Sequence, residues 1–199
     1  QLESLMASPG FYMEWKNSSS VSLAFNRFYD NVYEAFDLSD DIQVPIGEYT
    51  NKDLTLMYQT PQVNFLSANF NLTSGTFYGG DRFSAGVTPS LTLSKYLTLS
   101  GFYQYNQIDF NNAQLKAHVG RLKVSTSLDV HLSVNAFVQV NSLSKVSAAN
   151  LRLRYNWKDG NDLYIVYNET LNNNGRSDLT LPFSDYRALI VKYIYTFQW

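Results

Sequence analysis

Apolar and polar residues alternate over most of this chain, and the alternation constrains its fold more than any other feature. In the stretch HLSVNAFVQVN, which begins at His131, every second residue from Leu132 is apolar. The same period of two runs through residues 84–93 and through the last fourteen residues. Because successive side chains of a β-strand point to opposite faces, this pattern predicts strands with one apolar and one polar face.

About eleven such segments can be delimited, because clusters of Gly, Asn, Asp, Ser and Pro separate them. Their predicted bounds are Phe11–Asn17, Ser20–Phe36, Tyr49–Thr60, Val63–Thr73, Arg82–Leu93, Leu97–Asp109, Leu115–Ser127, His131–Asn141, Ser147–Trp157, Asp162–Glu169 and Tyr186–Trp199. No stretch approaches the ~18 apolar residues that a membrane helix needs. The sequence therefore predicts an all-β fold in which any membrane is crossed by strands.

Composition narrows the classes of protein further. Tyr and Phe number 15 and 13 among 199 residues, more than a soluble core usually requires. The net charge of -2, with no basic block, gives no reason to expect nucleic acid as a partner. The absence of cysteine excludes a disulfide framework and a structural thiolate zinc site.

Two arginines indicate which face of the strands would be outside. Arg152 and Arg154 alternate with Leu151, Leu153 and Tyr155. An arginine on the lipid face near the midplane costs roughly 2–4 kcal/mol, so in a membrane the apolar set must face the lipid. A soluble sandwich inverts this assignment, and alternation alone does not separate the two architectures.

Connection lengths favour the membrane alternative. Brief links at Asn17, Thr60, Ser94 and Lys158 alternate with generally longer ones that begin at Ser39, Ser74 and Thr170, and a short link near Ser142 is an exception. Short periplasmic turns and longer extracellular loops are typical of an antiparallel up-and-down transmembrane β-barrel. A soluble up-and-down barrel would show the same sorting only by chance.

The strand count leads to an expectation about the whole domain. Single-chain bacterial barrels normally have an even number of strands with both termini in the periplasm, whereas about eleven are visible here. We therefore expect residues 1–199 to be a single outer-membrane β-barrel domain or the C-terminal portion of a larger one. If the count is wrong by one strand in residues 26–41, the inference of a larger barrel no longer follows.

Four segments carry a resemblance to a known family. FNRFYDNVYEAFDLSDDIQVPIGEYT, LTSGTFYGGDRFS, FVQVNSLSKVSAANLRLRYNWKDGNDLYIVYNE and RALIVKYIYTFQW resemble the C-terminal barrel of an uncharacterised Gram-negative outer-membrane family. The resemblance covers about Phe11–Trp199. Longer members of this family carry an N-terminal domain similar to a family 9 carbohydrate-binding module. It implies a location in the outer membrane, and we expect residues 1–199 not to include that module. The closing strand, which ends on Trp199, also resembles the signal read by the barrel-insertion machinery.

The charged residues predicted to face the lumen are Arg121, Lys123, Arg152, Arg154 and Lys192. They could form a basic strip that attracts anions. The alternative is a structural network in which carboxylates on the same face neutralise them, and we favour it. The candidate carboxylates are Glu14, Glu34, Asp162 and Glu169.

A second candidate is the motif FYGGDR, formed by Phe77, Tyr78, Gly79, Gly80, Asp81 and Arg82. Its glycines permit a tight loop, and Asp81 and Arg82 could pair beside it. A loop that turns the chain and docks on its neighbours is favoured over one that contacts a ligand.

Catalytic and metal sites find little support. His131 and Ser133 have the spacing that places a base beside a hydroxyl, with Asn135 or Asn141 to orient the base. The pair follows a short turn, so we favour a polar pair without catalysis. His118 has no evident partner in the sequence. The acidic residues Asp37, Asp40, Asp41 and Glu48 lack EF-hand spacing and are interpreted as a solvated loop, so no metal or cofactor is expected.

Aromatic residues near strand ends are predicted to form membrane girdles, because amphipathic rings prefer the headgroup region. They are Trp15, Tyr155, Trp157, Tyr193, Tyr195, Phe197 and Trp199, with Tyr103 and Tyr105 also facing outward. Packing in a soluble core is the alternative. Phe102 and Phe137 are predicted to face inward, where they fill the lumen or form a platform for a sugar ring; we favour filling.

The sequence therefore predicts a non-enzymatic outer-membrane β-barrel that serves as the membrane anchor or passage for a carbohydrate-related periplasmic module. One alternative is a structural subunit of a larger outer-membrane complex, and another is a lumen-facing lipid hydrolase. Expected partners are outer-membrane lipid, the barrel-insertion machinery and other envelope chains, and no nucleic acid.

Overall fold

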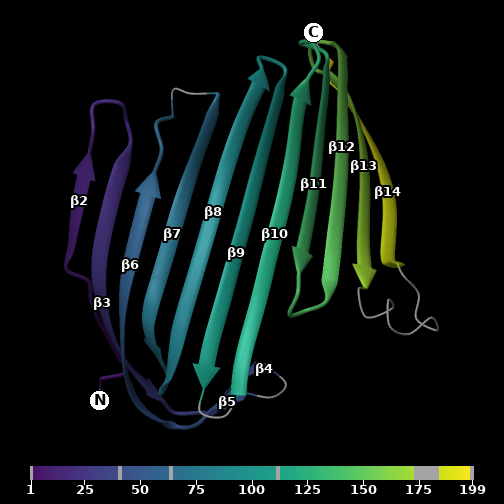
Figure 1. The fold of residues 1–199 in the computed structure, drawn as a ribbon. Coiled ribbons are helices and arrows are strands. Elements are labelled where there is room, and N and C mark those ends of the chain that lie inside the picture. The colour runs from purple at the N-terminus through teal and green to yellow at the C-terminus, as the bar shows by residue number, and fades with distance from the viewer. Residues whose placement is uncertain (1, 40–41, 63–64, 111–112, 173–183, 198–199) are drawn as a thin grey trace. The chain divides into compact units, whose positions relative to one another are not determined.

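The computed structural model describes residues 2–39, 42–62, 65–110, 113–172 and 184–197, which form fourteen β-strands (Figure 1). The strands are β1 (Ser4–Ala7), β2 (Gly10–Glu14), β3 (Ser20–Val32), β4 (Phe36–Ser39), β5 (Ile42–Val44), β6 (Gly47–Gln59), β7 (Leu66–Phe77), β8 (Gly80–Ser94), β9 (Leu97–Phe110), β10 (Ala113–Ser127), β11 (Leu132–Asn141), β12 (Val146–Lys158), β13 (Asn161–Asn172) and β14 (Ser184–Tyr195). None of the described residues belongs to a helix long and apolar enough to cross a membrane.

The strands follow one another through the sheet in nearly chain order. The order is β1-β3-β6-β7-β8-β9-β10-β11-β12-β13-β14, β2 also pairs with β3, and β4 and β5 form a separate two-stranded sheet. Every described register between neighbouring strands is antiparallel. This confirms the all-β, antiparallel, up-and-down arrangement that the sequence predicts for a transmembrane barrel.

About eleven strands were predicted, which is close to the number of strand positions in the main sheet, because β1 and β2 share one position. β1 pairs with residues 27–30 of β3, and β2 pairs with residues 20–24 of the same strand. Pro9 lies between them and has no N–H to donate, although its carbonyl oxygen accepts the N–H of Phe25 at 2.9 Å. The main sheet thus has eleven positions along its described path. Whether a larger barrel includes this sheet stays a prediction.

The contacts divide the chain into two compact units. The first unit comprises residues 1–87 and 104–117, and the second comprises residues 88–103 and 118–199. Strands β8, β9 and β10 therefore contribute residues to both units. The expectation of a single domain stays a prediction.

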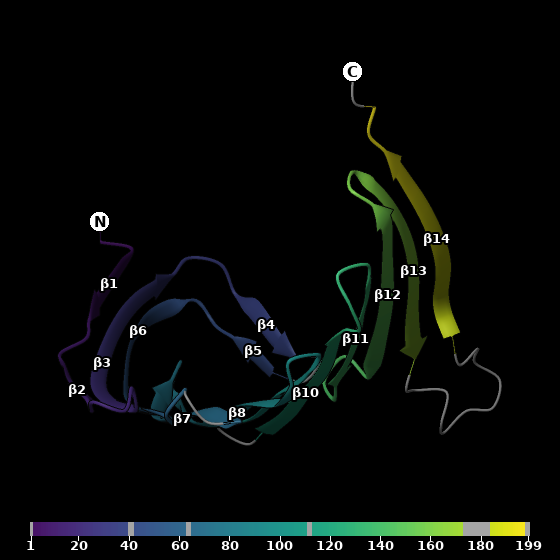
Figure 2. The same ribbon diagram turned by 90° about the horizontal axis from the view of Figure 1, so that it is seen from above.

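Two predicted connections are wrong in detail. The segment predicted as strand Ser20–Phe36 with a long loop after it is instead β3 as far as Val32, followed by the β4–β5 hairpin, which Figure 2 shows beside the ends of β3 and β6. The longer loop expected after Ser74 is a two-residue connection between β7 and β8, because pairing continues to Phe77. The remaining long connections, residues 33–46 and 173–183, leave from the same end of their strands, as predicted.

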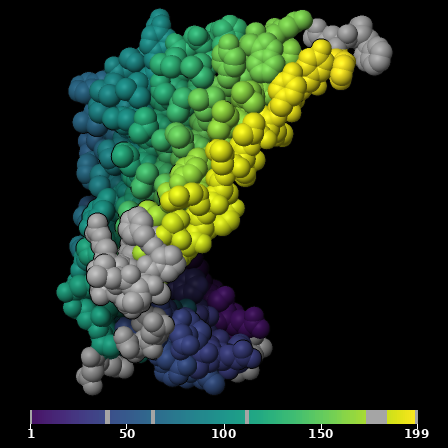
Figure 3. All heavy atoms as spheres, turned by 90° about the vertical axis from the view of Figure 1, so that its right-hand side faces the viewer, coloured from purple at the N-terminus to yellow at the C-terminus, as the bar shows by residue number. Residues whose placement is uncertain are grey.

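The sheet has no conventional apolar core among the residues that the structure describes. Only Val32, Ile42 and Val44 are buried apolar residues there, and all three lie at or near the β4–β5 hairpin. By contrast, Leu189 and Val191 of β14 are 68% and 61% exposed, and Figure 3 shows β14 as a continuous yellow band along the green strands of its unit. A soluble sandwich would bury such a face, so the observed exposure favours contact with lipid.

Candidate functional site

The five charged residues predicted to face the lumen share one face of the second unit. The registers place each of them directly opposite a residue of the neighbouring strand, and because side chains alternate, the pairs define a single face. The pairs are Arg121 with Gln139, Lys123 with Phe137, Arg152 with Asn135, Arg154 with Ser133, and Lys192 with Tyr164. We call this the basic face.

Two arginines of the basic face contact rings rather than carboxylates. The guanidinium of Arg121 lies 4.8 Å from the ring centre of Phe102, and that of Arg152 lies 5.3 Å from the ring centre of Tyr164. Arg154 is different, because its Nε donates to the carboxylate of Asp162 at 2.7 Å. Among the described residues, no carboxylate lies within 4.0 Å of the other four cations.

A hollow of about 530 Å³ lies on the basic face over β10, β11 and β12. Its lining consists of Lys123, Asn135, Ala136, Phe137, Asn150 and Arg152. Lys123, Phe137 and Asn150 form one row across the three strands, and Asn135 and Arg152 stand opposite each other in the next row. Asn150 also donates to Asn168 of β13 at 2.5 Å, which fixes its orientation. The hollow therefore combines two cations, two amides and one ring.

The neutralising network favoured from the sequence forms only in part. Asp162 pairs with Arg154 as expected. Glu14 instead accepts the hydroxyl of Tyr12 at 3.0 Å. Glu169 was expected in the lumen, which is wrong, because its register with Arg187 places it on the opposite, apolar face. The basic face consequently keeps most of its positive charge.

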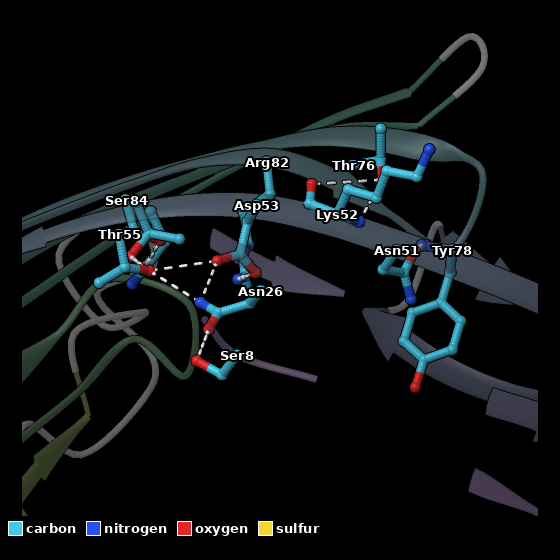
Figure 4. A network of polar contacts seen from close by, with 12 residues as sticks. Ser8, Asn26, Asn51, Lys52, Asp53, Thr55, Thr76, Tyr78, Arg82 and Ser84 are labelled. Carbon is cyan, nitrogen blue, oxygen red and sulfur yellow. Dashed lines mark hydrogen bonds and ion pairs between the residues drawn. The ribbon is translucent and has the colours of Figure 1, made fainter. Parts of the chain in front are cut away.

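A second polar cluster lies in the first unit, on the polar face of β3, β6 and β8 (Figure 4). Asp53 is its centre: it accepts the Asn26 amide at 2.6 Å and the Arg82 guanidinium at 2.8 Å. Ser8 and Thr55 extend the cluster through hydrogen bonds of 2.5 Å and 3.3 Å to Asn26. Arg82 is thus neutralised, and we assign this cluster a structural role.

The FYGGDR motif therefore lies differently from the prediction. Phe77 ends β7, residues 80–82 belong to β8, and only Tyr78 and Gly79 form the turn, with φ of 47° and 87°. Two consecutive residues with positive φ are typical of the tightest hairpin turns. The expected pairing of Asp81 with Arg82 is wrong, because Arg82 bonds Asp53 instead.

Tyr78 joins this turn to the β4–β5 hairpin. Its ring makes edge contacts with Phe36, Tyr49 and Phe77 at centroid distances of 5.5, 5.2 and 4.8 Å. Its hydroxyl donates to the Asp30 carboxylate at 2.7 Å. Partial burial and this hydrogen bond raise the pKa of Tyr78 to about 12.

The histidines make structural contacts. His131 Nδ1 lies 2.7 Å from the carbonyl oxygen of Asn156, and its backbone N–H donates to Asp129, as does that of Leu132. These two bonds hold the pKa of Asp129 below its usual range. His118 was expected to lack a partner, but its Nδ1 lies 2.8 Å from the Tyr103 hydroxyl. No group of three metal-binding side chains occurs in the described ranges, and Asp40 and Asp41 lie outside them.

The predicted girdle aromatics of the second unit contact one another in sequence along one end of the sheet. Trp157 stacks on Tyr193 at 5.4 Å with planes 4° apart, and Tyr195 meets Phe197 at 4.6 Å. Tyr155 contacts Trp157 at 6.0 Å and completes the chain of rings. Trp15 follows β2 at a turn of the first unit, whereas Trp199 lies outside the described residues.

Sequence reasoning missed several residues that the structure brings together. Asn150 was not singled out, although its even number places it on the face of Arg152 and Arg154. Arg27 and Lys52 were also missed, although their parity matches that of Phe25 and Leu54 on the apolar face. Counting parity within each strand would have found all three.

No protein-family model matches this chain, and no curated protein matches it either. Among solved structures, the chain is similar to the NanC porin, with a TM-score of 0.41, 11% identity, and coverage of 98% of this chain and 94% of that chain. It is also similar to the KdgM porin, with a TM-score of 0.38, 8% identity and coverage of 98% and 100%. The KdgM porin in complex with disordered oligogalacturonate gives a TM-score of 0.37, 7% identity and coverage of 98% and 96%.

Proposed function

We propose that this chain is a non-enzymatic domain of the outer membrane of a Gram-negative bacterium, and that its basic face lines a passage for anionic, hydroxyl-rich solutes of the acidic-sugar type. The observation that carries the proposal is the hollow in which Lys123 and Arg152 flank Asn135, Phe137 and Asn150. Neither cation has a carboxylate partner among the described residues.

Each group of the hollow suits one part of such a solute. Cations attract a carboxylate and raise its local concentration in a polar channel. The amides of Asn135 and Asn150 offer both donors and acceptors to hydroxyl groups. The ring of Phe137 offers an apolar surface to the face of a sugar ring. These groups can hold and guide an anion, and nothing in the set activates a nucleophile.

The proposal extends to the surroundings of the domain. The exposed apolar face contacts outer-membrane lipid, and the C-terminal strand is recognised by the barrel-insertion machinery. The link to a periplasmic carbohydrate-binding module, for which this domain would be anchor or passage, rests on the resemblance of the sequence segments. Other envelope chains are the partners in a larger complex.

The test is conductance of the protein in planar lipid bilayers across a KCl gradient. We expect channels that prefer chloride to potassium and that are blocked by a uronic-acid trisaccharide more strongly than by maltotriose, which has no charge. In Lys123→Gln/Arg152→Gln, the preference for chloride and the block by the acidic sugar should both weaken.

Lys16→Gln is the matched control, because Lys16 is an exposed cation in the turn between β2 and β3 and does not line the hollow. It should conduct and be blocked like the wild type. Channels that prefer potassium, or equal block by both sugars, would contradict the proposal. Hydrolysis of lipid that disappears in Ser133→Ala would instead support the lipid hydrolase alternative.

A further inference from the structure

Two cations lie directly opposite each other on the apolar face of the first unit. Arg27 of β3 is the cross-strand partner of Lys52 of β6, and Ala7 of β1 flanks Arg27 on its other side. Both cations are exposed. Figure 4 shows the side chain of Lys52 on the opposite side of the strand from Asn51 and Tyr78 of the polar face. The next row along the strands is apolar and consists of Phe25 and Leu54.

This pair lacks a counter-charge among the described residues. Like charges directly opposite each other on a sheet are destabilising. No described carboxylate lies within 4.0 Å of Arg27 or Lys52. Glu48, the nearest acid on this face along β6, is four positions from Lys52. An anion from outside the described chain would remove the repulsion.

The second unit shows the same kind of position with its charge satisfied. Arg187 of β14 also lies on an apolar face, but its cross-strand partner is Glu169, whose carboxylate it contacts at 2.6 Å. A cation on this face is therefore neutralised internally in one unit and not in the other.

Both positions lie in the outer half of the apolar band, which is about 25 Å tall in membrane barrels. Lys52 is six positions from Tyr58, which stacks with Phe70, and Arg187 is six positions from Tyr193, which stacks with Trp157. Six residues span roughly 20 Å along a strand, or about 15 Å along the membrane normal at the usual tilt. From there, long cationic side chains reach the headgroup region, where lipid phosphates lie.

An apolar hollow adjoins Arg27. It measures about 320 Å³ and is lined by Leu2, Leu5, Ala7, Arg27 and Tyr29. Leu5 pairs with Tyr29, so this hollow lies between Arg27 and the end of β3 at Val32, on the side of the long connection. Phe25 and Leu54, which are 47% and 49% exposed, lie on the other side of Arg27. A guanidinium with an apolar row on its inner side matches a molecule with a phosphate at its outer end and an acyl chain at its inner end.

We propose that Arg27 and Lys52 bind the phosphate of an anionic lipid of the outer leaflet, whose acyl chain lies over Phe25 and Leu54. This site is on the lipid side of the sheet and is separate from the basic face. It would hold an annular lipid at a fixed place on the protein and relieve the repulsion between the two cations.

The experiment measures the association of spin-labelled lipids with the protein in phosphatidylcholine nanodiscs by electron spin resonance. Spin-labelled phosphatidic acid should associate more strongly than spin-labelled phosphatidylcholine, on the order of fivefold per cation near the surface. Arg27→Gln/Lys52→Gln should lose this preference. Lys145→Gln, which removes an exposed cation from the β11–β12 turn, should keep it.

Three further measurements make the result decisive. Arg27→Lys keeps the charge and should keep the preference, and high salt should weaken the preference of the wild type. If the double variant does not insert into nanodiscs, the Arg27→Lys variant and the salt dependence of the wild type test the proposal. An unchanged preference in the double variant would overturn the proposal. Displacement of the lipid by inorganic phosphate, but not by chloride of equal ionic strength, would also overturn it, because free phosphate would then be the ligand.

Discussion

Arg154 and Asp162 pair diagonally across β12 and β13, with 2.7 Å between Nε and the carboxylate oxygen. Asp162 also accepts the amide of Asn156 at 3.1 Å, which holds it in this position. One residue pair closer to the middle of β12, Arg152 contacts only the ring of Tyr164 among the groups described around it. A single carboxylate thus limits how far positive charge extends along the basic face.

Removing that carboxylate should make the passage more selective for anions. In Asp162→Asn, Arg154 loses its counter-charge while the side chain keeps its size. In general, a unit charge about 8 Å from a passing ion changes the ion preference about twofold in a water-like medium. The reversal potential in planar bilayers across a KCl gradient measures this. Asp159→Asn removes an exposed charge from the adjacent turn and should leave the potential unchanged; no change in Asp162→Asn would contradict the assignment of the ion path.

Gly75 permits a close approach of β6 to β7. A Cβ at this position would lie 2.5 Å from the Cα of Asp53 and would also clash with the carbonyl oxygen of Lys52. We therefore expect Gly75→Ala to lower the free energy of unfolding by about 1–3 kcal/mol, as overpacked positions do. Urea titration in liposomes measures the loss. Gly120→Ala is the control, because a Cβ there meets no atom within 4 Å; equal effects in both variants would refute the steric explanation.

The stacking of Trp157 on Tyr193 should contribute to stability at the membrane boundary. Trp157→Leu keeps an apolar side chain but removes the stacked ring, and such aromatic pairs are worth about 0.5–1.5 kcal/mol beyond burial. The free energy of unfolding from liposomes should fall by that amount. Trp157→Phe retains an aromatic ring and should recover part of the loss. If leucine and phenylalanine behave alike, stacking is not the cause.

The same tryptophan reports the position of the membrane. A protein in which Trp157 is the only tryptophan should show fluorescence that is quenched by lipids brominated near the headgroup more than by lipids brominated at the chain ends, because girdle rings lie at the interface. Trp15 in an equivalent single-tryptophan variant should show the same pattern of quenching. Stronger quenching from the chain ends would place these rings in the bilayer interior and contradict the girdle assignment.

Tyr78 should make stability depend on pH at high alkalinity. Its pKa is raised to about 12, above the ordinary value near 10, so the folded state keeps the hydroxyl protonated while the unfolded chain ionises. The contribution is complete below about pH 10 and is lost as the pH rises toward 12. Tyr78→Phe should abolish this part of the pH dependence of unfolding. A wild type and variant with parallel pH profiles would show that the Asp30 contact does not persist in solution.

The sequence predicted the strands well where alternation is long and uninterrupted. Segments such as Leu97–Asp109 and Ser147–Trp157 agree with β9 and β12 within one residue at each end. The prediction failed where other forces decide. Pairing extends β7 to Phe77 although Gly75 and the following glycines indicate a loop, and a small buried cluster at Ile42 and Val44 turns an expected loop into a hairpin.

The sequence by itself determined which residues share a face, because the two-residue period of a strand assigns every side chain to one side. Arg121, Lys123, Arg152, Arg154 and Lys192 therefore share one face of the sheet, and their position in a lumen stays a prediction. Only the tertiary structure decided which charges are neutralised. Arg82 bonds Asp53, 29 residues away, rather than the adjacent Asp81, and Glu169 meets Arg187 on the apolar face. Such pairs depend on the register between strands. That register is set by contacts between residues that are distant in the sequence.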